Sequence, residues 1–266
     1  MTCTRGRGAP LQAGLRRGAP GVGGRVGRED LLTGYPDALV VDLVDDARRV
    51  LHVGCGTGAA SRLLAARGCA VLGVEFDEQM AAAARASGVG VDVARFEEWH
   101  PRGRVFDLVV SGHAWRWVDP ASGPARAAAA LGPGGRIALV GTVVKPFDGP
   151  FREVLRSSYE THAPALASSG PGLCTRPAPP ETERHVRSLL LSGRFGSSAV
   201  TRYTWERSYT RSQWLQLVAA YADHAALAPE PWSDLLRAVG DAVDEIGGTL
   251  VAAHETTCTT AETPRR

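Results

Sequence analysis

The residues best suited to chemistry begin with a glycine-rich turn, Gly54-Cys55-Gly56-Thr57-Gly58, which directly follows the apolar run 49–53. Glycines between a strand and a helix let a ligand approach the backbone without obstruction by a Cβ, and the helix N-terminus offers free amide donors. The next apolar run, 70–74, ends at Glu75, where a carboxylate can accept both hydroxyls of a ribose. The pattern predicts a ligand that contains a nucleoside, either an adenosyl-sulfonium or a dinucleotide.

A second group of candidate residues follows the predicted strand 105–111. Ser111 ends this strand, and His113, Trp115 and Trp117 come directly after it. Because ligands of open α/β sheets bind beyond the carboxyl ends of the strands, these side chains are expected near a second substrate. His113 is a candidate general base if its pKa lies near neutrality, while the two tryptophans either line a pocket or pack against the following helix.

Strand and helix periodicities alternate along the part of the chain that must position these residues. The predicted strands cover 49–53, 70–74, 89–93, 105–111 and 136–140. The predicted helices cover 38–44, 59–67, 77–86 and about 121–131. Such alternation implies right-handed crossovers. It predicts a Rossmann-like, doubly wound α/β fold with a mainly parallel, seven-stranded sheet and helices on both faces.

The segments on either side of this core have a different character. Residues 1–34 repeat Gly-Arg and Gly-Ala-Pro elements without an apolar period, and we expect them to be disordered. The expected single domain has a ligand-binding core over 35–141, helical additions with a sixth strand over 142–247 and a last strand over 248–261, and the tail is 262–266. Further predicted elements are helices near 149–160, 181–192, 211–222 and 230–246 and a strand over 199–206.

Composition narrows the possible classes of function. The 266 residues, 44% of them hydrophobic, suit one large α/β domain, and a formal net charge of +2 gives no argument for a nucleic-acid partner. The five cysteines have no metal-ligand spacing, so we expect no metal and a reducing compartment. Without a signal peptide or an apolar run near the roughly 18 residues of a membrane span, we expect a cytoplasmic protein with no membrane partner.

Four blocks of the sequence together resemble the class I S-adenosylmethionine-dependent methyltransferases. They are VLHVGCGTGAASRLLAARG, VLGVEFDEQMAAAARASG, FDLVVSGHAWRWVDP and LGPGGRIALV. The chain is especially similar, over about residues 35–261, to a bacterial branch with a methyltransferase type 11-like domain and small-molecule acceptors. The resemblance implies S-adenosylmethionine as cofactor and methyl transfer to an unidentified small molecule. In-line positioning can supply most of the acceleration of such a transfer, so no side-chain nucleophile is needed.

The resemblance also implies roles for individual residues. Those expected to contact the cofactor are Gly54, Cys55, Gly56, Gly58, Glu75, Phe76, Phe96, Glu97 and Ser111. Glu75 would bind the ribose, and Phe76 would lie against the adenine face. The expected lining of the acceptor pocket is Tyr35, Trp115 and Trp117, with His113 as the candidate catalytic base. Only Tyr35 remains of the lid-like N-terminal element of that branch.

His52 is the main departure from the family pattern, which has an acidic residue at this position. The loss of one charged hydrogen bond costs about 1.5–3 kcal/mol, or roughly tenfold to a hundredfold in affinity. One alternative is therefore a Rossmann-like binding or regulatory module without catalytic activity. The glycine pattern alone also permits an NAD(P)-dependent oxidoreductase, but Lys145 is the only lysine and no Tyr-x-x-x-Lys pair is present.

Overall fold

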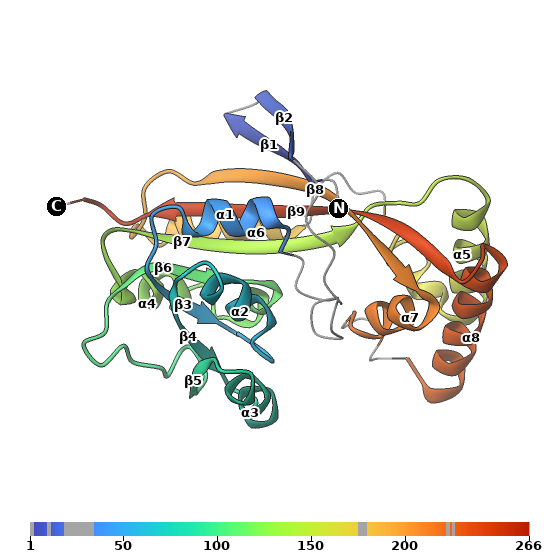
Figure 1. Cartoon of the computed structure of the whole chain (residues 1–266), viewed down its shortest axis with the longest axis horizontal. Helices are drawn as coiled ribbons and strands as arrows, with labels where there is room; N and C mark the ends of the chain where they lie inside the picture. Colours follow the sequence, from blue (N-terminus) through green and yellow to red (C-terminus); the bar gives the residue numbers. More distant parts are fainter. Residues whose placement is uncertain are drawn as a thin grey trace.

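The computed structural model describes residues 3–9, 12–18, 35–174, 180–221, 224 and 227–265. The strands of this part are β1 Cys3–Ala9, β2 Gln12–Gly18, β3 Arg49–Val53, β4 Ala70–Glu75, β5 Gly90–Val93, β6 Phe106–Ser111, β7 Leu131–Val144, β8 Ala199–Thr210 and β9 Thr249–Glu262. They form one sheet in the order β2-β1-β8-β9-β7-β6-β3-β4-β5 (Figure 1). The predicted Rossmann-like, doubly wound α/β fold is confirmed, with β1 and β2 added to the seven expected strands.

The centre of the sheet is parallel and contains a change of direction. Strands β5, β4, β3, β6 and β7 are parallel neighbours, while β9 lies antiparallel between β7 and β8. The chain lays down β3, β4 and β5 in one direction and then returns to place β6 on the other side of β3. The carboxyl ends of β3 and β6 therefore meet at a topological switch point, which is where open α/β sheets bind ligands.

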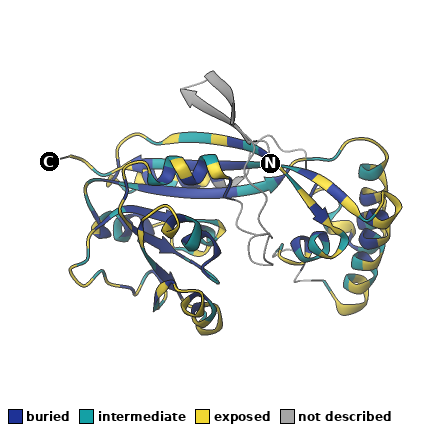
Figure 2. Cartoon of the chain, in the orientation of Figure 1, coloured by how far each residue is buried: buried dark blue, intermediate teal, exposed yellow. Residues whose placement is uncertain are grey.

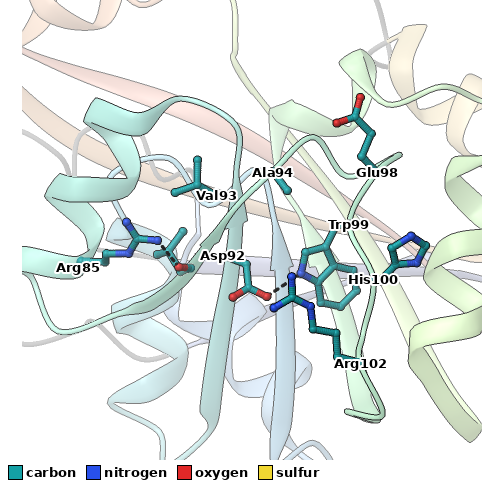
Figure 3. A pocket seen from close by; sticks show the side chains of 9 residues that line it. Arg85, Asp92, Val93, Ala94, Glu98, Trp99, His100 and Arg102 are labelled. Atoms are coloured by element: carbon teal, nitrogen blue, oxygen red, sulfur yellow. Dashed lines mark hydrogen bonds between the residues drawn. The ribbon is translucent and has the colours of Figure 1, made fainter.

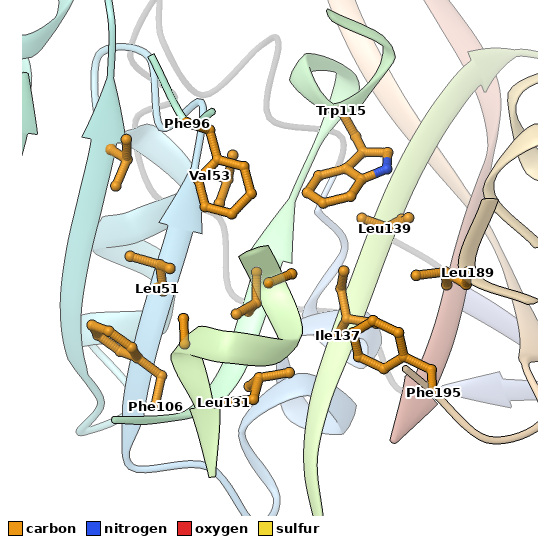
Figure 4. Close-up of a cluster of buried hydrophobic side chains, with 14 of the residues drawn as sticks. Leu51, Val53, Phe96, Phe106, Trp115, Leu131, Ile137, Leu139, Leu189 and Phe195 are labelled. Carbon is orange, nitrogen blue, oxygen red and sulfur yellow. The ribbon is translucent and has the colours of Figure 1, made fainter. Parts of the chain in front are cut away.

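Helices cover both faces of the parallel strands. The helices are α1 Asp37–Val44, α2 Ala59–Ala65, α3 Glu78–Ala86, α4 Gly123–Ala130, α5 Gly149–His162, α6 Pro180–Leu191, α7 Arg211–Ala219 and α8 Pro229–Glu245, with the 3-10 turns η1 His113–Trp117 and η2 Pro164–Leu166. Successive strand residues point to opposite faces. Accordingly Val109 packs with α4 and α6, whereas Val110 packs with α1 and α2. Figure 4 shows the cluster on the α4 side, and Figure 2 shows how burial follows the strands.

A second hydrophobic core lies where the three longest strands extend past the parallel centre. Side chains of α5, α7 and α8 pack there against the ends of β7, β8 and β9, including Val144, Tyr209 and Leu250. Figure 1 shows these helices as a group at one end of the molecule. Because β6 and β7 are parallel, this group stands beyond the same edge of the sheet as the switch point. The predicted division of the domain into a core, helical additions and a last strand, with boundaries at residues 141 and 247, stays a prediction. In the structure, one sheet runs through all three parts.

The expectation that residues 1–34 are disordered differs from the structure at β1 and β2. The structure places 3–9 alongside 200–205 of β8 and pairs 12–18 with 3–9, both antiparallel, while 19–34 lies outside the described residues. An edge strand such as β8 offers unpaired backbone donors and acceptors. Pairing with them needs no apolar period, which is the feature whose absence led to the prediction of disorder.

No helix of the described residues is long and apolar enough to cross a membrane.

Candidate cofactor site and active site

The glycine-rich turn connects β3 to α2 at the switch point. Gly54 and Gly56 have φ of 65° and 56°, in the left-handed region that favours glycine. A Cβ on Gly54 would lie 2.1 Å from the Cβ of Ala114, whereas a Cβ on Gly56 would meet no atom within 4 Å. The turn is therefore packed against η1 at Gly54 and open at Gly56. This is the arrangement expected of a backbone that a ligand approaches.

Glu75 links the end of β4 to this turn. Its side chain is 5% exposed, Oε2 accepts a hydrogen bond from the amide of Gly56 (2.9 Å), and Oε1 accepts one from the amide of Asp77 (3.0 Å). A carboxylate oxygen has a second acceptor position, so each oxygen can also receive a ligand hydroxyl. Gly56 and Glu75, which are 19 residues apart in the chain, are thus in hydrogen-bond contact, and their roles toward a ligand stay predictions.

His52 occupies the place of the expected acid beneath the turn. Its Nδ1 lies 2.7 Å from Oγ of Ser61 on α2, and burial lowers the pKa of His52 to about 4. The imidazole is therefore neutral near pH 7. It provides no attraction for a cationic amino group, and it also provides no repulsion. Sequence reasoning missed Ser61, because nothing in its local pattern indicates which strand residue it faces.

Cys55 offers the site its backbone groups, because its thiol is not in the reactive, deprotonated form. Burial, followed by the nearby charge of Glu75, raises the pKa of the Cys55 thiol to about 12, so it stays protonated. A Cβ on Gly73 would lie 2.4 Å from Sγ of Cys55, so glycine in the middle of β4 makes room for the sulfur. Sequence reasoning did not single out Gly73, although an isolated glycine inside a strand often marks such a close approach.

The end of β6 brings two further expected residues to the site. Ser111 is buried, and its Oγ donates a hydrogen bond to the carbonyl of Val53 (2.8 Å), which joins the ends of β6 and β3. Tyr35 is also buried, and its hydroxyl has no hydrogen-bond partner among the described residues. A Cβ on Gly112 would lie 3.5 Å from this hydroxyl. Burial raises the pKa of Tyr35, so the hydroxyl stays a donor next to the carboxyl end of β6.

The aromatic candidates divide into a buried and an exposed pair. Phe96 and Trp115 are buried in the core, with ring centroids 5.9 Å apart (Figure 4). By contrast, Trp117 is 72% exposed and Phe76 is 64% exposed. The structure therefore gives Phe96 and Trp115 a packing role behind the site, and their contacts with a ligand stay predictions.

The remaining predicted residues lie in the loops around the switch point. His113 is exposed at the start of η1. Glu97 follows β5, and its Oε1 accepts a hydrogen bond from the amide of Asp119 (2.9 Å). This bond joins the loop after β5 to the loop after η1, so Glu97 helps to hold the loops beside the site. In the described part of the chain, no group of three or more His, Cys, Asp or Glu side chains could hold a metal ion.

A cavity of about 230 Å³ opens at the free edge of β5 rather than at the glycine turn (Figure 3). Asp92 in its wall accepts hydrogen bonds from Nε1 of Trp99 (2.8 Å) and from Arg104 (2.7 Å). Arg85 also lines the cavity and donates to the carbonyl of Val91 (2.6 Å). These polar groups satisfy one another and one carbonyl of the edge strand. We therefore interpret this cavity as part of the structural edge of the sheet.

Comparison with known proteins identifies the central part of the chain. Residues 51–139 match the model of a methyltransferase domain. An uncharacterized methyltransferase of Mycobacterium tuberculosis is 38% identical over 108 residues, which are 40% of this chain and 44% of the relative. A trans-aconitate 2-methyltransferase of the same species is 35% identical over 77 residues, which are 28% of this chain and 29% of the relative. The chain thus spans less than half the length of these curated relatives.

A solved structure supports the fold over most of the chain. A proposed type II methyltransferase from Anaeromyxobacter dehalogenans superposes with a TM-score of 0.57 at 20% identity. The match covers 87% of this chain and 98% of that protein. The likeness therefore extends to the long antiparallel strands and the helices that follow the matched domain.

Proposed function

Residues 51–139 of this chain form a methyltransferase domain of the class I, S-adenosylmethionine-dependent type, and on that premise we propose that the protein methylates a small-molecule acceptor. The observation that carries the proposal is the contact between the amide of Gly56 and the carboxylate of Glu75 at the switch point. An open backbone turn and a buried carboxylate side by side suit the two halves of this cofactor, its amino-acid part and its ribose.

The residues present fit S-adenosylmethionine. The backbone of Gly54, Cys55, Gly56 and Gly58 would hold the amino-acid part, and Glu75 would accept the ribose hydroxyls. The fit is supported by the open space at Gly56 and by the unpartnered hydroxyl of Tyr35, a buried donor without an acceptor in the described structure. Ser111 would act through the backbone at the end of β6.

Methyl transfer depends mainly on how the protein positions the acceptor relative to the cofactor. The bound cofactor supplies a methyl group already activated by its sulfonium, so this chain must align an acceptor with it and exclude water. Tyr35 keeps its proton and can direct its hydroxyl at the reacting groups. Exposed Trp117 offers a flat apolar surface to the acceptor, and exposed His113 is the proposed base if the acceptor must lose a proton.

Calorimetric titration with S-adenosylmethionine and S-adenosylhomocysteine tests the cofactor assignment. We expect micromolar binding of either ligand and its loss in Glu75→Ala. The variant Glu98→Ala removes an exposed carboxylate from the neighbouring loop and serves as the matched control. If a folded protein binds neither ligand at millimolar concentration, or if Glu75→Ala binds like the wild type, the cofactor assignment is wrong.

A binding module without turnover is the second candidate function, and neutral His52 is the observation that favours it. The two candidates differ in the transfer of label. With methyl-labelled S-adenosylmethionine and a small-molecule extract, an enzyme transfers label to a low-mass product, whereas a module binds the cofactor and transfers none. We also propose a cytoplasmic location, which suits the free thiols that the described part of the chain carries at Cys55, Cys69, Cys174 and Cys258.

A further inference from the structure

A band of polar side chains crosses the three longest strands between two hydrophobic cores. On one face of β7, β8 and β9, alternate residues belong to the core under α1 at one end and to the core under α5, α7 and α8 at the other. Between the two cores, the same face carries the polar band, which is Thr142, Trp205, Arg207, His254 and Thr256. Apolar residues would pack more simply here, because every buried polar group has to find a hydrogen-bond partner. Packing alone therefore does not account for the polar band.

The polar band lies next to the proposed site. Tyr35, whose hydroxyl lies beside Gly112, packs in the same cluster as Cys258. Thr256 is two residues from Cys258 along β9, so it points to the same face and lies farther past the carboxyl end of β6. An acceptor aligned with the cofactor at Tyr35 would thus extend toward the polar band.

Arg207 is the cation of the polar band, and aromatic side chains hold it in place. Its guanidinium carbon lies 5.1 Å from the centroid of the Trp205 ring, and its side chain donates a hydrogen bond to the hydroxyl of Tyr209. The ring of His254 stacks on Trp205, with centroids 4.2 Å apart. Trp205 is fixed in turn, because its Nε1 donates to Oγ1 of Thr256 (2.9 Å).

The side chains around Arg207 are uncharged, and their hydrogen bonds have one possible direction. Burial raises the pKa of Tyr209 to about 12 and lowers the pKa of His254 to about 4, so both are neutral near pH 7. Nδ1 of His254 lies 3.0 Å from the carbonyl of Ala252, which can only accept, so Nδ1 carries the proton. Nε2 then accepts from the hydroxyl of Tyr209 (3.0 Å), and the oxygen of Tyr209 accepts from Arg207. These contacts orient the charge of Arg207 and do not neutralise it.

We propose that Arg207 binds a carboxylate of the methyl acceptor, so that the acceptors of this protein are small-molecule carboxylic acids. This inference rests on the proposed function. A guanidinium matches a carboxylate with two parallel hydrogen bonds. One cation balances one carboxylate, whereas a phosphate monoester carries about 1.5 to 2 negative charges near neutral pH and would stay partly uncompensated. A carboxylate is therefore the anion that this arrangement favours.

Fractionation of a small-molecule extract on an anion-exchange resin at neutral pH tests the class of acceptor. Each fraction is incubated with the wild-type protein and methyl-labelled S-adenosylmethionine, and the label in low-mass products is counted. We expect label in products of the salt-eluted fraction, which holds the anions, and we expect the transfer to survive treatment of that fraction with phosphatase. Transfer to unretained molecules alone, or its loss after phosphatase treatment, would overturn the proposal.

Variants of β8 test whether Arg207 is the residue that binds the acid. Arg207→Gln should raise the concentration of the salt-eluted fraction needed for half-maximal transfer about 10- to 100-fold, and Arg207→Lys should raise it less. Tyr209→Phe removes the oxygen that positions Arg207 and should raise this concentration by a smaller factor than Arg207→Gln. Arg202→Gln is the matched control, because it removes an exposed arginine that points to the opposite face of the same strand. All four variants should bind S-adenosylhomocysteine within about twofold of the wild type, since these residues lie outside the proposed cofactor site.

The outcomes separate this inference from the proposed function. If the wild type methylates only unretained molecules, or if Arg207→Gln behaves like Arg202→Gln, the role of Arg207 is wrong and the proposed function stands. If S-adenosylhomocysteine binds but label reaches neither fraction, both the carboxylic acid acceptor and the enzymatic activity are wrong. If neither S-adenosylmethionine nor S-adenosylhomocysteine binds, the cofactor assignment is wrong, and the inference that rests on it is wrong as well.

Discussion

Acid should destabilise the folded protein within a pH window that His52 sets. His52 is 3% exposed, and burial lowers its pKa from 6.5 to about 4. The unfolded chain keeps the ordinary value, so between these two pH values it binds a proton that the folded chain does not. The free energy of unfolding therefore falls as the pH drops from about 6.5 toward 4. Well above pH 6.5 this loss of stability is absent, because the imidazole is neutral in both the folded and the unfolded chain.

The size of the effect follows from the two pKa values. Their difference corresponds to about 3 kcal/mol in full, at about 1.4 kcal/mol for each unit. At pH 5 the unfolded imidazole is almost fully protonated and the folded one is mostly neutral, so about 2 kcal/mol is already lost. This is a large part of the roughly 5–15 kcal/mol that stabilises a typical domain.

Urea unfolding at pH 7.5 and pH 5.0 measures this contribution when the wild type is compared with His52→Asn. The wild type should lose about 2 kcal/mol more than the variant between the two pH values, because asparagine does not titrate. Burial also lowers the pKa of His254 to about 4, but this histidine is present in both proteins and cancels in the comparison. Equal losses in the two proteins would refute the reasoning.

Three further predictions concern the backbone around the site. Gly54→Ala should lower the free energy of unfolding by about 2 kcal/mol or more, measured by urea unfolding, because the new Cβ meets Ala114 at a positive φ. Gly73→Ala should cost about 1–3 kcal/mol in the same assay, and less in a Cys55→Ala background where the clashing sulfur is gone. Asp77→Ala should cost about 1 kcal/mol, because Asp77 caps α3 by accepting from two amides, whereas Asp77→Asn should keep most of the cap.

Local patterns were sufficient to predict the parallel centre of the fold. The run 49–53 is apolar and ends in glycines, and it forms β3 with the predicted bounds. The β1 and β2 strands could not be predicted in this way, because they pair through backbone with the edge of β8. Strand β7 likewise extends beyond the predicted 136–140 to Leu131–Val144. Antiparallel β9 pairs with Arg136–Val144 and so accounts for the extension past 140, while Leu131 at the other end pairs with Phe106 of β6.

Residues of the candidate site could be predicted where their place follows from the order of strands and loops along the chain. They could not be predicted where their place depends on tertiary packing. Glu75 was predicted as a site residue because it ends an apolar strand, and the structure places its carboxylate at the amide of Gly56. Burial is a property of the whole fold, so local sequence could not separate Trp115, which packs in the core, from Trp117, which is exposed. The pairing of His52 with Ser61 depends in the same way on how α2 lies against β3.

His52 places an uncharged side chain beneath the glycine turn, and this affects how the proposed site can bind its cofactor. With His52 beneath the turn uncharged and Cys55 within the turn protonated, neither side chain would attract the cationic amino group of the proposed cofactor. If the proposed function holds, the affinity for the cofactor has to come largely from the nucleoside end of the ligand, where the buried carboxylate of Glu75 lies at the amide of Gly56.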